Sequence, residues 1–195
     1  MDSVHYGPAA DSDRTEITVT RMTPLLENNE WSAHGFTPVP LSPPTAQVIV
    51  VTCLDHRLDP ARILGLEPGD APVIRNAGGR VTESVVADIA YLGFLARQVF
   101  GVEGPLFEIA VIHHTQCGTG FLADPGFRDQ AAEATGVPAP TLAASTVDDP
   151  SVTVKEDVER LLGSPLLPPG TTVSGHVYDV DTGRVAMVLD TPTGT

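Results

Sequence analysis

The chain has 195 residues, with 25 Asp and Glu against 11 Lys and Arg, which gives a formal net charge of −14 at pH 7. This length suits one substantial domain, and the acidic balance disfavours nucleic acid and anionic membrane surfaces as partners, because both require a basic face. No stretch approaches the roughly 20 consecutive apolar residues that a membrane span requires.

The N-terminal region does not have the pattern of a secretory signal. Met1 to Thr23 is polar and acidic and has no apolar core. We therefore expect a cytoplasmic protein in which the two cysteines, Cys53 and Cys117, are reduced thiols. Residues 1–21 contain few large apolar side chains and are expected to be flexible, whereas residues 22–195 are expected to form a single domain.

Apolar residues in the first half of the chain predict helices and strands in alternation. A short helix is expected within Met22–Gly35, followed by a proline-rich arm, Phe36–Pro44. Val48–Val51 is an unbroken β-branched run, which is typical of a strand covered on both faces. A short helix closed by Gly65 and a second strand, Ala71–Arg75, complete this part.

The second half supplies a long helix, a central strand and a closing hairpin. Together these segments predict an α/β fold: a mainly parallel β-sheet flanked by helices, with a C-terminal hairpin strand and an N-terminal arm. The expected elements are a helix at Thr82–Phe100, a strand at Leu106–Ile112, a helix from Pro125 to Gly136, a loop at Val137–Pro150, a helix at Ser151–Leu162 with a capping box from Thr153 to Glu156, and strands at Thr172–Tyr178 and Arg184–Leu189.

Side chains that bind soft metal ions follow the two most strand-like runs. Cys53 follows the first run, and His114 and Cys117 follow the central one. If these strands are neighbours in a parallel sheet, both loops open on the same edge, which is where such sheets bind ligands. Two thiolates and one imidazole form a three-ligand zinc set that leaves one position open for chemistry.

Two charged residues follow Cys53 at a spacing of two, namely Asp55 and Arg57. In an extended segment all three side chains would line one wall. Arg57 can hold Asp55 ionised through a forked hydrogen bond, which leaves the carboxylate to accept from zinc-bound water. Alternatively, Asp55 binds zinc itself and closes the site. Two thiolates acidify a zinc-bound water less than neutral imidazoles do, so activity should rise towards alkaline pH.

The order of these motifs resembles the β-class carbonic anhydrase family. They are Cys53-x-Asp55-x-Arg57, the Val73–Gly78 segment (Val-Ile-Arg-Asn-Ala-Gly) and His114-x-x-Cys117, and the similarity runs roughly from Leu25 to Val188. It is greatest with short bacterial members that have His-His-Thr-x-Cys-Gly. The resemblance implies hydration of carbon dioxide to bicarbonate by zinc-bound hydroxide, with one zinc ion per subunit, in a homodimer or a dimer of dimers.

The resemblance also assigns roles to individual residues. It makes Cys53, His114 and Cys117 the zinc ligands and Asp55 with Arg57 the catalytic dyad, and it places Asn76, Ala77 and Gly78 at the substrate pocket. Three positions depart from the family pattern. His113 stands where many members have glycine, His56 where a small residue is usual, and Gln116 where aspartate is frequent.

Two other functions remain open on the sequence alone. The family includes hydrolases of carbonyl sulfide and carbon disulfide with the same ligand set, and attack on these similar linear molecules needs no new catalytic group. A zinc-stabilised or redox-responsive interaction protein would use the cysteines without turnover. The Asp55 and Arg57 pair argues against this last function, because a closed metal site needs neither residue.

Overall fold

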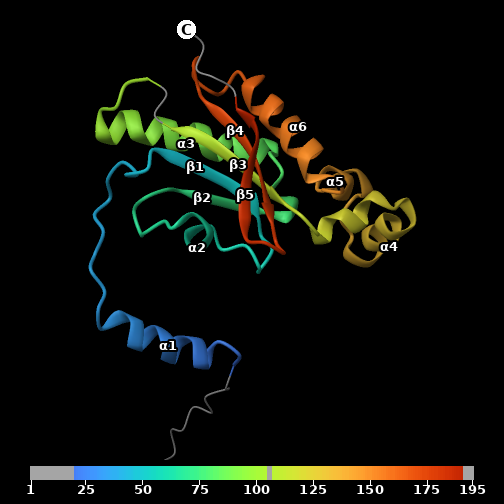
Figure 1. The fold of residues 1–195 in the computed structure, drawn as a ribbon, viewed down its shortest axis with the longest axis horizontal. Helices are drawn as coiled ribbons and strands as arrows, with labels where there is room; N and C mark the ends of the chain where they lie inside the picture. The colour runs from blue at the N-terminus through green and yellow to red at the C-terminus, as the bar shows by residue number, and fades with distance from the viewer. Residues whose placement is uncertain (1–19, 105–106, 191–195) are drawn as a thin grey trace, which may run out of the picture. The chain divides into compact units, whose positions relative to one another are not determined.

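The computed structural model describes residues 20–104 and 107–190 (Figure 1). The chain divides into two compact units, residues 1–39 and residues 40–195. In the first, the described element is helix α1 (Thr23–Ala33), none of whose residues is buried. Residues 1–19 of the segment expected to be flexible lie outside the described residues, and a domain boundary at residue 22 stays a prediction.

The second unit is built on one five-stranded sheet with the strand order β2-β1-β3-β4-β5. The first four strands in this order are parallel, and β5 pairs antiparallel with β4 as a hairpin. This confirms the predicted fold class. The strands are β1 (Val48–Cys53), β2 (Val73–Asn76), β3 (Glu108–His114), β4 (Val173–Asp179) and β5 (Arg184–Asp190).

Among the described residues of this unit, five helices and two 3-10 turns connect the strands. No helix among the described residues is long and apolar enough to cross a membrane. The helices are α2 (Pro60–Leu64), α3 (Glu83–Phe100), α4 (Pro125–Thr135), α5 (Ala139–Ala144) and α6 (Pro150–Leu162), and the 3-10 turns are η1 (Ala77–Gly79) and η2 (Gly118–Ala123).

Alternate residues of the two central strands face opposite sides of the sheet and enter separate apolar clusters. Ile49 of β1 and Val111 of β3 pack with residues of α3 and α6. Val50 and Ile112 belong to a second cluster on the other face, which also contains Cys53. Because both faces are covered along β1 and β3, these strands read as unbroken apolar runs.

Two details of the sequence prediction were wrong. The segment Val137–Pro150, predicted to be a loop, contains the short helix α5. The capping box from Thr153 to Glu156 does not form, because α6 begins earlier and its N-cap is Asp149, which accepts hydrogen bonds from the amides of Ser151 and Val152. Thr153 lies inside the helix instead, where its hydroxyl donates to the Asp149 carbonyl.

Candidate metal centre

The three predicted metal ligands meet at the C-terminal edge of the sheet. Strands β1 and β3 are parallel neighbours, with Thr52 opposite Ile112, so the residues that follow end side by side. Cys53 and His114 are the last residues of these strands rather than the first residues of loops. The ligand atoms of Cys53, His114 and Cys117 all lie within 4.8 Å of one another, and all three residues are buried.

The orientation of His114 suits a metal ligand. Its Nδ1 lies 2.9 Å from the Thr115 carbonyl oxygen, which can only accept, so Nδ1 carries the ring proton. The other nitrogen, Nε2, is buried and has no hydrogen-bond partner. A buried acceptor without a partner is destabilising unless something binds it, and a second-shell carbonyl on the opposite nitrogen is the usual support of a metal-bound histidine.

The two thiols supply the rest of the donor set. Their sulfur atoms lie 3.9 Å apart, close to the separation of about 3.8 Å between two thiolates on a tetrahedral zinc ion. The hydrogen bond with Cys117, together with burial, raises the pKa of Cys53. Hydrogen bonds from Cys53 and from Thr119, whose hydroxyl oxygen lies 3.1 Å from the Cys117 sulfur, lower the pKa of Cys117. The pair therefore shares a proton between its sulfur atoms, and a metal ion that binds both thiolates would displace it.

Asp55 and Arg57 form the forked ion pair beside this cluster. Arg57 Nε donates to Asp55 Oδ1 at 3.0 Å, and Arg57 Nη2 donates to Asp55 Oδ2 at 2.6 Å. These hydrogen bonds hold the pKa of the Asp55 carboxyl well below its usual range. The prediction of an extended segment whose side chains line one wall was wrong. The backbone turns here, and the Arg57 amide donates to Asp55 Oδ1 at 2.9 Å. The catalytic role of the pair stays a prediction.

The glycine-bearing loop lies against the backbone of Cys53. Asn76 is opposite Cys53 in the pairing of β2 with β1, and the Gly78 amide hydrogen-bonds to the Cys53 thiol. Gly79 has a φ of +70°, and a Cβ atom there would lie 2.6 Å from the Cys53 nitrogen. This loop can therefore approach Cys53 only without a side chain at Gly79. That Asn76, Ala77 and Gly78 line the substrate pocket stays a prediction.

Comparison with known proteins matches residues 48–185 to the carbonic anhydrase family model. Beta-carbonic anhydrase 1 of Mycobacterium bovis is 35% identical over 161 residues, which cover 82% of this chain and 93% of that protein. The chain belongs to the β-carbonic anhydrase family.

Two further β-carbonic anhydrase relatives bear on the fold and on the substrate. The solved carbonic anhydrase of Streptococcus mutans is 36% identical with a TM-score of 0.72, over 89% of this chain and all of that one. A carbon disulfide hydrolase of Acidianus sp. is 30% identical, over 73% of this chain and 78% of that protein. Membership of the family therefore supports a carbonic anhydrase lyase at the level of the family, with hydrolases among its relatives.

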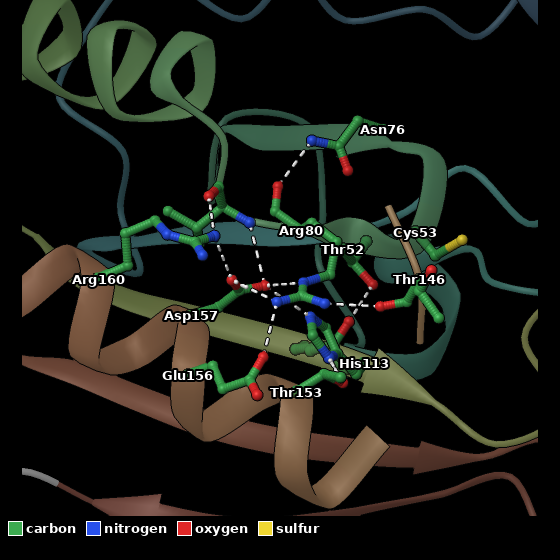
Figure 2. Close-up of polar contacts among 12 residues, drawn as sticks. Thr52, Cys53, Asn76, Arg80, His113, Thr146, Thr153, Glu156, Asp157 and Arg160 are labelled. Carbon is green, nitrogen blue, oxygen red and sulfur yellow. Dashed lines mark hydrogen bonds and ion pairs between the residues drawn. The ribbon is translucent and has the colours of Figure 1, made fainter. Parts of the chain in front are cut away.

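A buried carboxylate, Asp157 of α6, supports this β-carbonic anhydrase site from the opposite face of the sheet (Figure 2). It accepts hydrogen bonds from Arg80 Nε at 2.7 Å, Arg160 Nη1 at 2.9 Å and the Val81 amide at 3.1 Å. His113 Nε2 lies 3.2 Å from the same carboxylate. Asp157 thus connects helix α6 to the residue before the candidate ligand His114 and to the end of the glycine-bearing loop.

The pairing of Arg80 with Asp157, which are 77 residues apart, was not predicted from the sequence. One signal was available. Val154, Val158 and Leu161 form the apolar face of α6, and Asp157 has the spacing of that same face. A carboxylate in an apolar stripe indicates a buried partner of opposite charge, although the sequence does not identify which arginine supplies it.

Replacing Asp157 by alanine should lower the free energy of unfolding by about 3–5 kcal/mol, because it leaves the buried Arg80 guanidinium without its carboxylate. Glu156→Ala is the matched control. Glu156 also binds Arg80, but its side chain is 53% exposed, so its loss should be about 1 kcal/mol or less. Urea denaturation at pH 7 measures both values, and equal losses in the two variants would contradict the assigned role of Asp157.

The contribution of Asp157 to the free energy of unfolding should also depend on pH. Burial opposes ionisation of Asp157, but hydrogen bonds from His113 and Arg80 outweigh it and lower the pKa of the carboxyl. The unfolded chain therefore binds the proton first, and the stabilisation is lost as the pH falls below about 4. The difference in stability between wild type and Asp157→Ala should shrink over that range, and a constant difference would argue against an ionised Asp157.

Gly79→Ala should destabilise the protein and weaken metal binding together, because the new Cβ would displace the backbone that carries Cys53. Gly65→Ala is the control. Gly65 has nearly the same φ, +68°, but open space around it, so it isolates the cost of the left-handed backbone at about 1 kcal/mol. Denaturation and zinc competition with a chelator measure the two effects. A zinc affinity in Gly79→Ala equal to that of Gly65→Ala would contradict the proposed contact.

Proposed function

We propose that this protein is a zinc-dependent carbonic anhydrase that hydrates carbon dioxide to bicarbonate and a proton. One zinc ion per subunit would be held by Cys53, His114 and Cys117. The observation that carries the proposal is the buried, unpartnered Nε2 of His114 facing two thiols, with an ionised carboxylate beside it. The similarity to the mycobacterial β-carbonic anhydrase supports the same reaction.

Each residue of the site has a distinct task in this proposal. When bound, zinc would act as a Lewis acid that makes a water molecule acidic enough to serve as the nucleophile. Asp55 Oδ2 lies 3.9 Å from His114 Nε2, beside the candidate ligands, so the carboxylate would accept a hydrogen bond from that water. Arg57 keeps Asp55 ionised and oriented through two hydrogen bonds. Asn76, Ala77 and Gly78 would border the substrate pocket.

Hydrolysis of carbonyl sulfide or carbon disulfide is the second candidate, and the carbon disulfide hydrolase relative supports it. These molecules are linear and uncharged like carbon dioxide, so the same residues could perform the same tasks. A non-catalytic zinc-stabilised or redox-responsive protein is the third candidate. It would have no use for an ionised carboxylate held beside the metal ligands, and we rank it last for this reason.

We also propose a homodimer or a dimer of dimers. In the N-terminal unit, Leu25, Leu26 and Trp31 of α1 are 55%, 58% and 81% exposed. In the other unit, the sheet has a groove of about 250 Å³ with an almost entirely apolar lining, which includes the exposed Leu64 and the half-buried Val185. Apolar surface of this kind is typical of subunit interfaces. A cytoplasmic location remains a prediction.

Asp55→Ala should retain zinc and the wild-type fold but lose roughly 100-fold or more in turnover, the usual contribution of a positioned proton acceptor. Asp59→Ala is the control, because Asp59 is exposed and makes no capping hydrogen bond. Stopped-flow hydration of carbon dioxide across pH, with carbonyl sulfide hydrolysis on the same zinc-assayed batch, separates the candidates. Fast hydration that rises with pH supports the proposal. Negligible hydration with rapid sulfide release would favour the hydrolase, and zinc without either activity would favour the binding protein.

The proposed dimer predicts that wild type has at least twice the subunit mass of 20.5 kDa in light scattering. Leu26→Asp combined with Trp31→Asp should shift the mass towards one subunit, because charge would enter an apolar interface. Val152→Asp is the control, since Val152 is an apolar residue 52% exposed on α6 and does not line the groove. A wild-type mass of one subunit would contradict the proposal.

A further inference from the structure

Gln116 has an unusual backbone conformation in the metal-binding loop. It lies between His114 and Cys117, and its φ is +55°. Only one other non-glycine residue in the described chain, Gln47, has a positive φ. A side chain with a Cβ atom disfavours this left-handed region, and glutamine lacks the short polar side chain that lets asparagine and aspartate adopt it more easily. Interactions around Gln116 must therefore stabilise it.

The turn between β4 and β5 provides these interactions. Gln116 Nε2 donates to Asp181 Oδ2 at 2.8 Å. The adjacent Thr115 amide donates to the Tyr178 carbonyl at 3.0 Å, and the Thr115 hydroxyl accepts from the Val180 amide at 3.1 Å. Asp181 is fixed in turn, because its own amide donates to a side-chain oxygen of Asp179. Residues 115 and 116 are thus held against the hairpin turn by three hydrogen bonds.

The conformation of Gln116 directs its carbonyl oxygen to Arg57. Arg57 Nη2 donates to this oxygen at 2.9 Å, and the same nitrogen donates to Asp55 Oδ2 at 2.6 Å. The Gln116 carbonyl is therefore an anchor for the guanidinium that is independent of Asp55. The Arg57 side chain is 38% exposed. Without the Gln116 carbonyl, its position would depend on Asp55, the carboxylate that it is expected to orient.

We propose that Gln116 and Asp181 are positioning residues: their hydrogen bond sets the Gln116 carbonyl that anchors Arg57, and Arg57 in turn orients Asp55 beside the metal ligands. The effect on catalysis rests on the proposed function, whereas the effect on Arg57 does not. Neither Gln116 nor Asp181 touches the reacting atoms in this proposal. A hairpin turn far from the metal ligands in sequence thereby contributes to the geometry of the site.

The test uses the full-length, zinc-loaded protein and three variants. Asp181→Ala and Gln116→Gly each remove the side-chain hydrogen bond, and glycine tolerates the left-handed backbone, so neither needs to disrupt the fold. Asp181→Asn keeps an acceptor oxygen for Gln116 and serves as the matched control. The readout is exchange with water of the Arg57 Nε proton in nitrogen-15 spectra, assigned by its absence in Arg57→Lys.

Asp181→Ala and Gln116→Gly should each accelerate this exchange roughly five- to tenfold, as expected for the loss of one supporting hydrogen bond, whereas Asp181→Asn should behave as wild type. The double variant should exchange no faster than either single variant, because both remove the same interaction. For carbon dioxide hydration, kcat should fall by a similar factor in the two disrupting variants, with KM and zinc content unchanged. Asp181→Asn should restore kcat.

Unchanged exchange in both disrupting variants would overturn the proposal, as would additive effects in the double variant or fast exchange in Asp181→Asn. These results are distinguishable from a failure of the proposed function. If no protein, wild type included, hydrates carbon dioxide while the exchange rates change as expected, the role of Gln116 and Asp181 in holding Arg57 stands and the assigned reaction is wrong. If wild type is active and exchange does not change, the reaction stands and the positioning role is wrong.

Discussion

The parallel pairing of β1 with β3 is the constraint on which the rest of the site depends. Five residue pairs, from Val48 with Glu108 to Thr52 with Ile112, fix the register, and the Thr52 hydroxyl adds a hydrogen bond of 2.7 Å to the Ile112 carbonyl. The register brings Cys53 and Cys117 together although they are 64 residues apart in sequence. A slip of one residue would exchange the two faces of the strand and separate the sulfur atoms from the imidazole.

Because side chains alternate along β3, the two adjacent histidines face opposite sides of the sheet. His114 faces the thiols, whereas His113 faces α6, where its ring nitrogens contact Thr153 and Asp157. Many members of the family have glycine at position 113. The contacts of the His113 ring explain why this chain can have histidine there. The imidazole of His113 fills a buried position and lies in the network around Asp157, so the strand that carries the candidate ligand His114 is packed on both faces of the sheet.

Much of the fold could be predicted from the sequence, because its signals are local. The unbroken apolar runs of β1 and β3, the long helical stripe of α3 and the glycine that closes α2 each depend on neighbouring residues. Helix α5 has only six residues, too few for a periodic pattern, and it lies in a stretch of Pro, Ala and Thr that was interpreted as a loop. The three candidate ligands could be predicted because strand ends and ligand chemistry are both visible in sequence.

Long-range contacts account for what could not be predicted. The partners of Asp157 come from a loop and a strand distant in sequence, and the backbone of Gln116 depends on Asp181 in another turn. Local propensity favours neither the left-handed conformation of a glutamine nor a carboxylate in an apolar stripe. Both arise because tertiary hydrogen bonds compensate the local cost, and such compensation is concentrated around functional sites.

The charges around the site indicate why an ion pair accompanies the ligands. Two thiolates would neutralise a divalent cation, and the Arg57 guanidinium neutralises Asp55, so the cluster as a whole would carry no net charge although most of it is withdrawn from water. A closed structural site of two cysteines and two histidines reaches the same neutrality without such an ion pair. Their presence adds one oriented acceptor at no net charge, which is what proton transfer from a bound water requires. Because carbon dioxide, carbonyl sulfide and carbon disulfide are all linear and uncharged, this acceptor would serve each of them equally. Under the proposed function, discrimination among these molecules would therefore come from groups other than the candidate ligands and the ion pair.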